Sequence, residues 1–343
     1  MAYNDKIRAS AALTGISRAV FETVYAQFPF AAYFPLVERP TRQFELTQVA
    51  PRSSAVASKL VGYNTTAPRG GGQAAAKVVH GRAARTSEAR LVDEFNLIST
   101  PSAEQLGEWM DEKARSLGEV IANRLRLMAG EVLATGKIDM AEGNTSQIVD
   151  FNRPKANQVT LTGANLWADA ASTPLENLKA WRTAAGGANH LFVSRATLDA
   201  LQKNTDLIKR ALQRGTDLLG DISDADVASV LSQYGFALHV LSDEDNVITA
   251  YDGTAKTVIP ADHAFLLPPA GASVLGTSAV GETHLAPTVE AEQAHYGIPA
   301  GARSGVWCGA FHEDDPEGYS VRAAAEFMPL LKAPGAVVAA KVA

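Results

Sequence analysis

The residues of this chain most able to do chemistry are one cysteine and seven histidines. Cys308 has no second thiol with which to pair, so no intramolecular disulfide and no thiolate cluster can form, and a buried, inert thiol is expected. The histidines never recur four residues apart, the spacing that places two zinc ligands on one helix face. They are His80, His190, His239, His263, His284, His295 and His312. This pattern predicts no metal ion.

Two short motifs resemble ligand sites but lack the spacing that such sites need. Residues 312–315 carry oxygen ligands that suit a hard cation, yet they lack EF-hand spacing and end at Pro316, so a solvated turn is favoured. Residues 70–77 resemble a phosphate-binding loop, but Ala76 stands where glycine should precede the lysine. We therefore expect no cofactor and no enzyme activity, with a dispersed active site as the alternative.

The elements around these residues include a polar, glycine-rich stretch at 50–92, which we call the arm. It has almost no large apolar side chain after Val61 except Val78 and Val79. A segment of this composition cannot bury a core on its own chain, so we expect another subunit to hold it. The residues expected to make this inter-subunit contact are Arg69, Gly70, Gly71, Gly72, Lys77, Arg82 and Arg85.

A long helix is predicted directly after the arm, over residues 101–135. Thr100 is expected as its N-cap, Pro101 as its first residue and Gly136 as its end. Its apolar residues recur with the helical period at Leu106, Met110, Leu117, Val120, Ile121, Leu125, Met128 and Val132. We expect this stripe to pack on a sheet formed partly by residues 337–342. A rigid helix beside a projecting arm suggests a subunit that clasps its neighbours.

The rest of the chain alternates short helices and strands, which predicts an α+β fold. Ser194 is expected to cap one helix that runs to about residue 214. Asp252-Gly253 is predicted as a hairpin turn. The segment 321–342 carries two apolar runs separated by Pro334-Gly335, a pattern suited to a pair of long strands.

Charge is distributed unevenly along the chain, whose formal net charge is −6. From Arg52 to Arg90 there are seven basic residues and one acid, a local balance of +6. Residues 171–290 carry eight basic and fourteen acidic residues, a balance of −6. A solvated surface is the simpler interpretation of each run, but opposite charges could also steer copies together in a salt-dependent way.

Composition excludes several classes of protein. At 343 residues and 46% hydrophobic content, the chain is typical of a folded protein rather than a disordered one. No stretch approaches the ~18 consecutive apolar residues of a membrane span. The first residues lack the basic-then-apolar pattern of a signal peptide, so we expect no membrane partner and a protein that works in the cytoplasm or after release from it.

The order of these segments resembles the lambda-type phage major capsid proteins, the E family. The resemblance is carried by Arg69-Gly70-Gly71 in the arm, by the long helix, and by the runs VDFNRP at 149–154 and VTLTGANLW at 159–167. The tail is also similar, at FLLP (265–268) and MPLL (328–331). These motifs are structural rather than catalytic, and together they cover nearly the whole chain.

The resemblance implies the HK97-like major capsid fold. Its expected parts are an N-terminal arm at 1–44, an extended E-loop at 50–92, a peripheral domain at 93–170 and 291–343 with its spine helix at 101–135, and an axial domain at 171–290. The implied function is that of a structural major capsid protein of a tailed double-stranded DNA phage or prophage. Copies would assemble in the host cytoplasm, as hexamers and pentamers, into the icosahedral head shell of the virion.

The implied partners are further copies of the chain, a separate scaffolding protein and a portal, and a decoration protein is an additional candidate. The shell would enclose DNA without reading its sequence. An encapsulin-like bacterial nanocompartment shell protein has the same fold by resemblance and stays an alternative. It would differ in enclosing an enzyme cargo instead of DNA.

Overall fold

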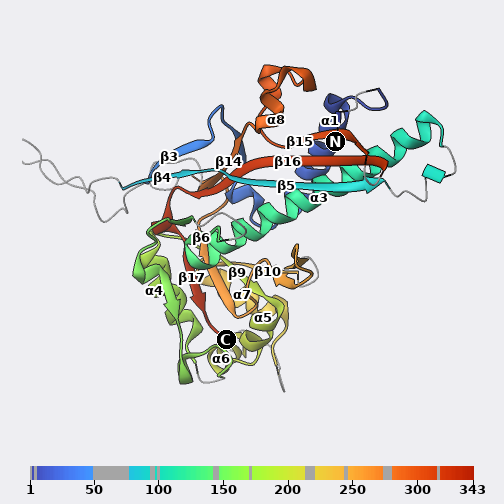
Figure 1. Ribbon diagram of the computed structural model, residues 1–343. Coiled ribbons are helices and arrows are strands. Elements are labelled where there is room, and N and C mark those ends of the chain that lie inside the picture. The colour runs from blue at the N-terminus through green and yellow to red at the C-terminus, as the bar shows by residue number, and fades with distance from the viewer. Residues whose placement is uncertain are drawn as a thin grey trace, which may run out of the picture.

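The computed structural model describes most of the chain. The described residues are 2–3, 6–48, 77–92, 97–98, 101–141, 147–169, 172–212, 221–242, 246–272, 280–314 and 317–343. Two sheets organise them. A six-stranded sheet and two long helices form an elongated part, and a five-stranded sheet with shorter helices forms a second part beside it (Figure 1).

The six-stranded sheet is built around one fifteen-residue strand, β16. Its strands are β1 (Ala2–Tyr3), β15 (Trp307–Asp314), β16 (Glu317–Leu331), β14 (Gly281–Ala286), β2 (Leu36–Glu38) and β5 (Ala84–Val92). Ala324 of β16 pairs with both Trp307 of β15 and Ser87 of β5, so β15 and β5 lie on opposite edges of β16. Strand β14 continues along the β16 edge beyond β15.

Both faces of this sheet are covered, as the alternation of side chains in β15 shows. Trp307 and Phe311 face a cluster that includes Ile298, on the segment after α8 (Val289–Glu292). The intervening Cys308 faces α1 (Ser10–Ala26), where its carbonyl oxygen accepts a hydrogen bond from the Thr14 hydroxyl at 3.1 Å.

The predicted long helix is α3 (Ala103–Thr135), which at 33 residues is about 50 Å long. The expectation of Thr100 as N-cap is wrong, because Ser102 caps the helix. The Ser102 hydroxyl accepts from the Gln105 amide, and the Gln105 side chain accepts from the Ser102 amide at 3.0 Å, a complete capping box. Gly136 ends the helix in the left-handed conformation, as predicted.

The apolar stripe of α3 packs mainly on α1 and β16, and much less on β17 (Val338–Lys341). The expected packing on residues 337–342 is therefore largely wrong. Helices α1 and α3 approach closely at Gly118, where an added Cβ would lie 2.4 Å from the Ser17 carbonyl oxygen. Within the stripe Leu125 is fully buried, whereas Val120 is partly exposed.

Among the described residues, the second part contains a five-stranded sheet and four α-helices. Its strands, in spatial order, are β10 (Ala237–Leu241), β9 (His190–Ser194), β13 (His263–Leu267), β17 and β8 (Gln158–Thr160). Its helices are α4 (Pro174–Ala184), α5 (Arg195–Gln202), α6 (Thr205–Leu212) and α7 (Asp224–Gln233). The core includes Trp167 and Trp181, whose ring centroids are 5.5 Å apart.

Ser194 does cap a helix, but the predicted single helix to residue 214 is two helices, α5 and α6. Asn204 lies between them and is fully buried. Its side-chain oxygen accepts from the amides of Asp206 and Leu207, and its amide nitrogen donates to the Ser172 carbonyl. Asparagine offers the backbone an alternative to helical hydrogen bonds, so it ends one helix and starts the next.

The two apolar runs of the tail are strands, but they do not pair with each other. Strand β16 lies in the six-stranded sheet and β17 in the five-stranded sheet, and residues 334–336 lead the chain from one to the other. Strand β14 precedes the expected boundary at residue 290, yet it pairs in the six-stranded sheet. Strands β14 and β17 thus lie on opposite sides of the expected limit at residue 290 from the sheets in which they pair.

Aromatic side chains join the two parts. Phe30, which follows α1, lies 4.8 Å from Phe192 of β9 and 6.0 Å from Phe265 of β13, measured between ring centroids. Tyr33 packs edge-on against Phe192 and donates a hydrogen bond to the Pro268 carbonyl at 3.0 Å. This contact connects the N-terminal segment to the second sheet.

The expectation that the arm has no partner on its own chain is wrong for residues 78–92. Strand β4 (Val78–Arg82) pairs with β3 (Gln43–Thr47), and β5 pairs with β16 over nine residues. Two further hairpins are formed by β6 (Lys137–Asp139) with β7 (Ile148–Asp150) and by β11 (Val247–Thr249) with β12 (Ala255–Thr257). The last of these closes through the predicted Asp252-Gly253 turn.

Candidate subunit-assembly site

The residues predicted to contact a neighbouring subunit are only partly described. Arg69, Gly70, Gly71 and Gly72 lie outside the described residues. Lys77, Arg82 and Arg85 are described, and all three are exposed. Lys77 precedes β4, Arg82 ends it, and Arg85 lies near the start of β5. The structure therefore shows where the arm leaves the body of the subunit.

The β3–β4 ribbon is this point of departure, and it lies at one end of the six-stranded sheet (Figure 1). Phe44 and Leu46 alternate on its buried face and are each 5% exposed. Gly81 lies against the Phe44 ring, where an added Cβ would lie 2.4 Å from the ring carbon Cζ. The Ala83 amide donates to the Arg42 carbonyl at 2.8 Å and closes the ribbon at its base.

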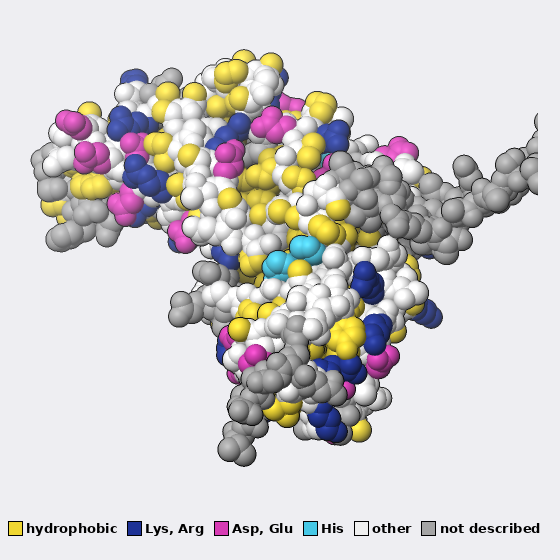
Figure 2. All heavy atoms as spheres, turned by 180° about the vertical axis from the view of Figure 1, so that it is seen from behind, with side chains coloured by type: hydrophobic (Ala, Val, Ile, Leu, Met, Phe, Trp, Pro, Cys, Tyr) yellow, Lys and Arg dark blue, Asp and Glu magenta, His cyan; other side chains and the backbone are white. Residues whose placement is uncertain are grey.

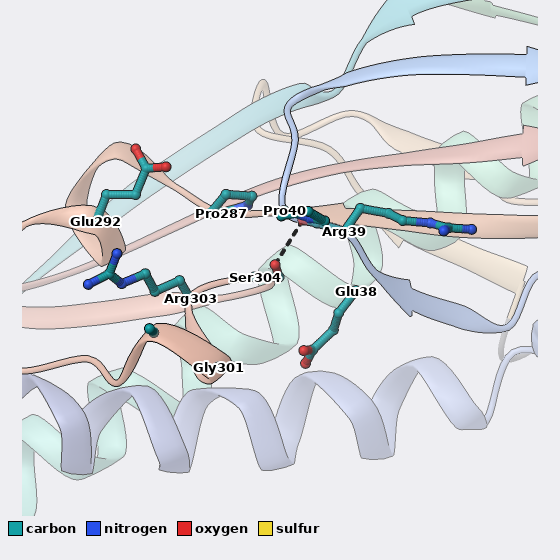
Figure 3. A pocket seen from close by; sticks show the side chains of 9 residues that line it. Glu38, Arg39, Pro40, Pro287, Glu292, Gly301, Arg303 and Ser304 are labelled. Carbon is teal, nitrogen blue, oxygen red and sulfur yellow. Dashed lines mark hydrogen bonds between the residues drawn. The ribbon is translucent and has the colours of Figure 1, made fainter.

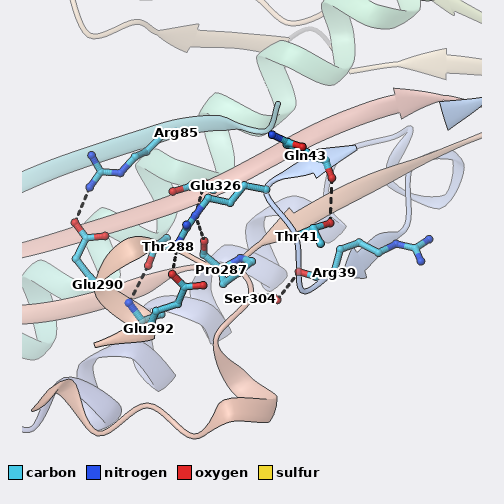
Figure 4. Close-up of polar contacts among 12 residues, drawn as sticks. Arg39, Thr41, Gln43, Arg85, Pro287, Thr288, Glu290, Glu292, Ser304 and Glu326 are labelled. Atoms are coloured by element: carbon cyan, nitrogen blue, oxygen red, sulfur yellow. Dashed lines mark hydrogen bonds and ion pairs between the residues drawn. The ribbon is translucent and has the colours of Figure 1, made fainter. Parts of the chain in front are cut away.

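A network of ion pairs surrounds this base (Figure 4). Arg42 lies 2.5 Å from a carboxylate oxygen of Glu292 and 3.2 Å from one of Glu326. Arg85 lies 2.5 Å from Glu290 Oε1, which also accepts from Arg322. The network connects the residue before β3 and the strands β5 and β16 to α8. Arg85, predicted to reach another subunit, is thus paired within its own chain.

Glu326 is the most buried acid of this network, with only 5% of its side chain exposed. Burial raises the pKa of its carboxyl group, and the positive charges of Arg42, Arg85 and Arg82 oppose that increase. Its position in the otherwise apolar run Ala323–Leu331 is a sequence signal that could have revealed it, because a lone acid in such a strand needs a cationic partner.

Glu282 forms a second buried centre on β14. Its carboxylate forms ion pairs with Lys332 Nζ at 2.5 Å and with Arg39 Nη2 at 3.3 Å, and 9% of its side chain is exposed. Like Glu326, it fixes a segment that is distant in sequence, here the Arg39 stretch after β2, to the central strands. Sequence reasoning missed these acids because their arginine partners, Arg39 for Glu282 and Arg42 for Glu326, lie more than 240 residues away.

An open pocket of about 330 Å³ lies beside the network (Figure 3). It is lined by Glu38, Arg39, Pro40, Pro287, Glu292, Ala300, Gly301, Arg303 and Ser304. The Ser304 hydroxyl donates to the Arg39 carbonyl at 2.9 Å, so it is held as a structural hydrogen-bond donor. Neither a cysteine nor a histidine lines this pocket, so its lining offers charged and polar groups for contact but no activated nucleophile.

The cysteine and histidines do not form a reactive centre in the part of the chain that the structure describes. Cys308 is fully buried, and burial raises the pKa of its thiol to about 12. His190 Nδ1 lies 2.9 Å from His239 Nε2, a contact that sequence spacing could not reveal, and burial followed by the charge of His190 lowers the pKa of His239. Among the described residues, no three His, Cys, Asp or Glu side chains are grouped as metal ligands would be.

The molecular surface carries apolar side chains that the subunit itself does not cover. On the face shown in Figure 2 they gather on the upper part, above histidine side chains where the two parts meet. Among the described residues, the large apolar side chains with the greatest exposure are those of Tyr251, Ile98, Ile148, Leu91, Val247, Val289, Val240 and Val78. Within the described segments, no helix combines the length and apolar character needed to cross a membrane.

Comparison with known proteins agrees with this architecture. The chain is similar to a structure assigned as a prophage capsid protein from E. coli CFT073, at 15% identity and a TM-score of 0.63, with 96% of this chain and 99% of that one covered. It is also similar to a phage-related protein from Bordetella bronchiseptica RB50, at 12% identity and a TM-score of 0.56, with 94% and 96% covered. These likenesses confirm the predicted HK97-like capsid fold.

No curated protein matches the sequence. A family model described as phage major capsid protein E matches residues 37–342, almost the entire length. This match agrees with the resemblance seen in the sequence motifs and favours a phage capsid over a nanocompartment shell. The chain belongs to the phage major capsid protein E family.

Proposed function

We propose that copies of this chain join as hexamers and pentamers into a closed icosahedral shell that encloses double-stranded DNA. The match to the capsid family over residues 37–342 carries this proposal. The charged clusters of the described residues agree with it, because Arg42, Arg85 and Lys332 form ion pairs with Glu326, Glu290 and Glu282 within the fold. The chain thereby acts as a structural protein of the virion, assembled in the cytoplasm of the host.

The arm is the proposed contact between copies. The ion pairs of Arg42 and Arg85 fix the base of the arm to the body of the subunit. A contact between the arm and another copy would therefore hold the whole subunit in place. Repetition of one such head-to-tail contact closes into rings, and rings of identical subunits can tile a shell. Arg69, Gly70, Gly71, Gly72, Lys77, Arg82 and Arg85 remain the residues proposed to reach the next copy.

The two parts of the subunit take different places in this proposal. The six-stranded sheet with α1 and α3 corresponds to the peripheral domain, and the five-stranded sheet with α4 to α7 corresponds to the axial domain at the centre of each ring. Tail strand β17 and strand β8 belong with the axial sheet through their pairing. The proposed partners besides further copies are a separate scaffolding protein and a portal, with a decoration protein on the outside as a further candidate.

Electron microscopy of the chain expressed alone and together with its neighbouring genes tests the proposal. We expect isometric shells, with DNA inside when the phage packaging proteins are present. Shells loaded with a specific enzyme would instead indicate a nanocompartment. A chain that stays monomeric under all these conditions would contradict shell formation itself.

A further inference from the structure

The strands of the β11–β12 ribbon present an uncharged outer face, and the one acid of the turn, Asp252, is bonded to Thr254. The ribbon pairs with neither main sheet. Side chains two residues apart on a strand share a face with their cross-strand partners. Val247, Thr249, Ala255 and Thr257 therefore lie on one face, and all are exposed. Tyr251, in the turn that closes the ribbon, is 81% exposed.

The tip of the ribbon is held by its own hydrogen bonds. Asp252 Oδ1 accepts from the Thr254 amide at 3.0 Å and from the Thr254 hydroxyl at 2.6 Å. Gly253 adopts a positive φ of 78° that suits glycine. Ala250, on the other side of Tyr251, donates its amide to the Thr254 carbonyl at 2.8 Å. The backbone is therefore fixed on both sides of Tyr251, and the aromatic ring is presented on an ordered turn.

The base of the ribbon is fixed to the body of the subunit. The side-chain nitrogen of Asn246 donates to the Ile259 carbonyl at 2.6 Å, and the side-chain oxygen of Asn246 accepts from the Ile259 amide at 2.7 Å. Ile248 and Val258 are buried in the main core at 8% and 4% exposure. Gly130 of α3 approaches so closely that an added Cβ would lie 2.0 Å from the Val258 carbonyl oxygen. A surface ordered before binding loses little conformational entropy when it binds.

Charge indicates what this face binds. Each copy of the chain carries the same net charge of −6, and the region around the ribbon is acidic. Two copies can approach with least repulsion, and without stripping water from charges, where both surfaces are uncharged. DNA would need basic residues, but the ribbon has only Lys256, which pairs across the strands with buried Ile248 and so lies on the other face.

We propose that the β11–β12 ribbon docks on a second copy of this chain through Tyr251 and Val247. This inference rests on the proposed shell function and adds a second contact to that of the arm. Tyrosine is common at the centre of protein interfaces because it buries a large area with few rotatable bonds. Val247, 54% exposed, extends the contact along the ribbon.

Assembly of purified subunits tests the inference. In Tyr251→Ser/Val247→Ser, the concentration at which shells appear in light scattering should rise about tenfold or more, since each tenfold corresponds to only ~1.4 kcal/mol of contact free energy. The melting temperature of the unassembled subunit should be unchanged, because both side chains are exposed. Lys256→Ser, on the other face, is the matched control and should assemble as the parent does. If the double variant assembles as the parent does, the inference is overturned and the proposed shell function is unaffected.

Thiol labelling supplies a second readout. Cys308 is the one cysteine and is buried, so Thr249→Cys, on the same face, introduces a single accessible thiol and leaves Tyr251 and Val247 in place. Labelling should be at least about tenfold slower in empty shells than in unassembled subunits. Protection that appears only in DNA-filled shells would assign the face to DNA and overturn the inference. A parent chain that never assembles overturns both this inference and the proposed function.

Discussion

Arg42 Nε lies 3.2 Å from Glu326 Oε2, and this pair fastens the base of the arm to the central strand of the main sheet. Glu326 is the single charged residue between Ala323 and Leu331, and its side chain is 5% exposed. Arg42 immediately precedes β3 and also donates from Nε to the Pro287 carbonyl at 3.0 Å. One guanidinium thus holds together three segments that are far apart in sequence.

Arg42→Met should destabilise the subunit by about 3 kcal/mol, because it leaves the carboxylate of Glu326 buried without its nearest cation. Urea unfolding of the unassembled subunit measures this loss. The matched control is Arg90→Met on β5, whose partner Glu88 is 2.7 Å away but whose pair is exposed. That variant should lose no more than about 0.5 kcal/mol. Equal losses would show that burial of the pair does not matter.

The pH dependence of stability should report on Glu326. Burial raises its pKa in the folded state, so the folded state binds this proton more tightly than the unfolded chain does. Its contribution to stability is therefore complete below the ordinary carboxyl pKa and is lost as the pH rises through the folded-state value.

Glu326→Gln cannot ionise, so its stability relative to the parent should improve as the pH rises from the ordinary carboxyl pKa, about 4, through the folded-state value. All other groups titrate alike in the two proteins, so their effects cancel when the unfolding free energies are compared at the same pH. Urea unfolding at several pH values gives these free energies directly. A difference that does not change with pH would mean that the pKa of Glu326 is the same in both states.

Local signals in the sequence predicted much of the fold. Helical periodicity and Gly136 placed α3 and its end, and Asp252-Gly253 placed a hairpin turn, because each signal depends on residues that are close in sequence. The N-cap was misplaced by two residues since Thr100 and Ser102 have the same capping chemistry. The pairing of β5 with β16 was missed because β5 is polar, and polar strands show little of the alternation that reveals a strand.

The charged network was not predicted for a different reason. Arg85 was expected to contact another subunit because it lies in a basic arm, yet its partner Glu290 is 205 residues away. Sequence shows the sign of each charge but not which distant charge folding brings beside it. The buried acid Glu326 was visible as an anomaly in an apolar run, whereas its pairing with Arg42 depends on tertiary structure.

Glycine substitutions should distinguish close packing from open space in the paired helices. Gly118→Ala in α3 places a Cβ 2.4 Å from the Ser17 carbonyl oxygen, so we expect a loss of about 2 kcal/mol as α1 is displaced. Gly15→Ala in α1 has no neighbouring atom within 4 Å and should gain about 0.5–1 kcal/mol from helix propensity. Thermal melting compares the two variants. Stabilisation by both would mean that α1 and α3 do not meet at Gly118.

The stability lost when a side chain of α3 is truncated to alanine should depend on how buried that side chain is, and not on whether it belongs to the apolar stripe. Leu125→Ala removes a fully buried side chain and should cost about 2–5 kcal/mol. Val120 shares the predicted stripe but is partly exposed, so Val120→Ala should cost less than about 1 kcal/mol. Urea unfolding and the yield of folded subunit measure both effects. Similar losses would restore the original expectation that the whole stripe faces a sheet.

Assembly should respond to salt through the charges of the arm. Residues 52–90 carry seven basic residues and one acid, whereas residues 171–290 have a net balance of −6. If these regions attract one another between copies, the assembly rate should decrease as ionic strength rises from about 0.05 to about 0.5 M, because the Debye length falls below ~10 Å. Light-scattering kinetics at several salt concentrations measure this rate. Finished shells should respond much less, since exposed ion pairs contribute only about 0–1 kcal/mol each. A rate that increases with salt would mean that repulsion between net-negative subunits outweighs the attraction of the arm.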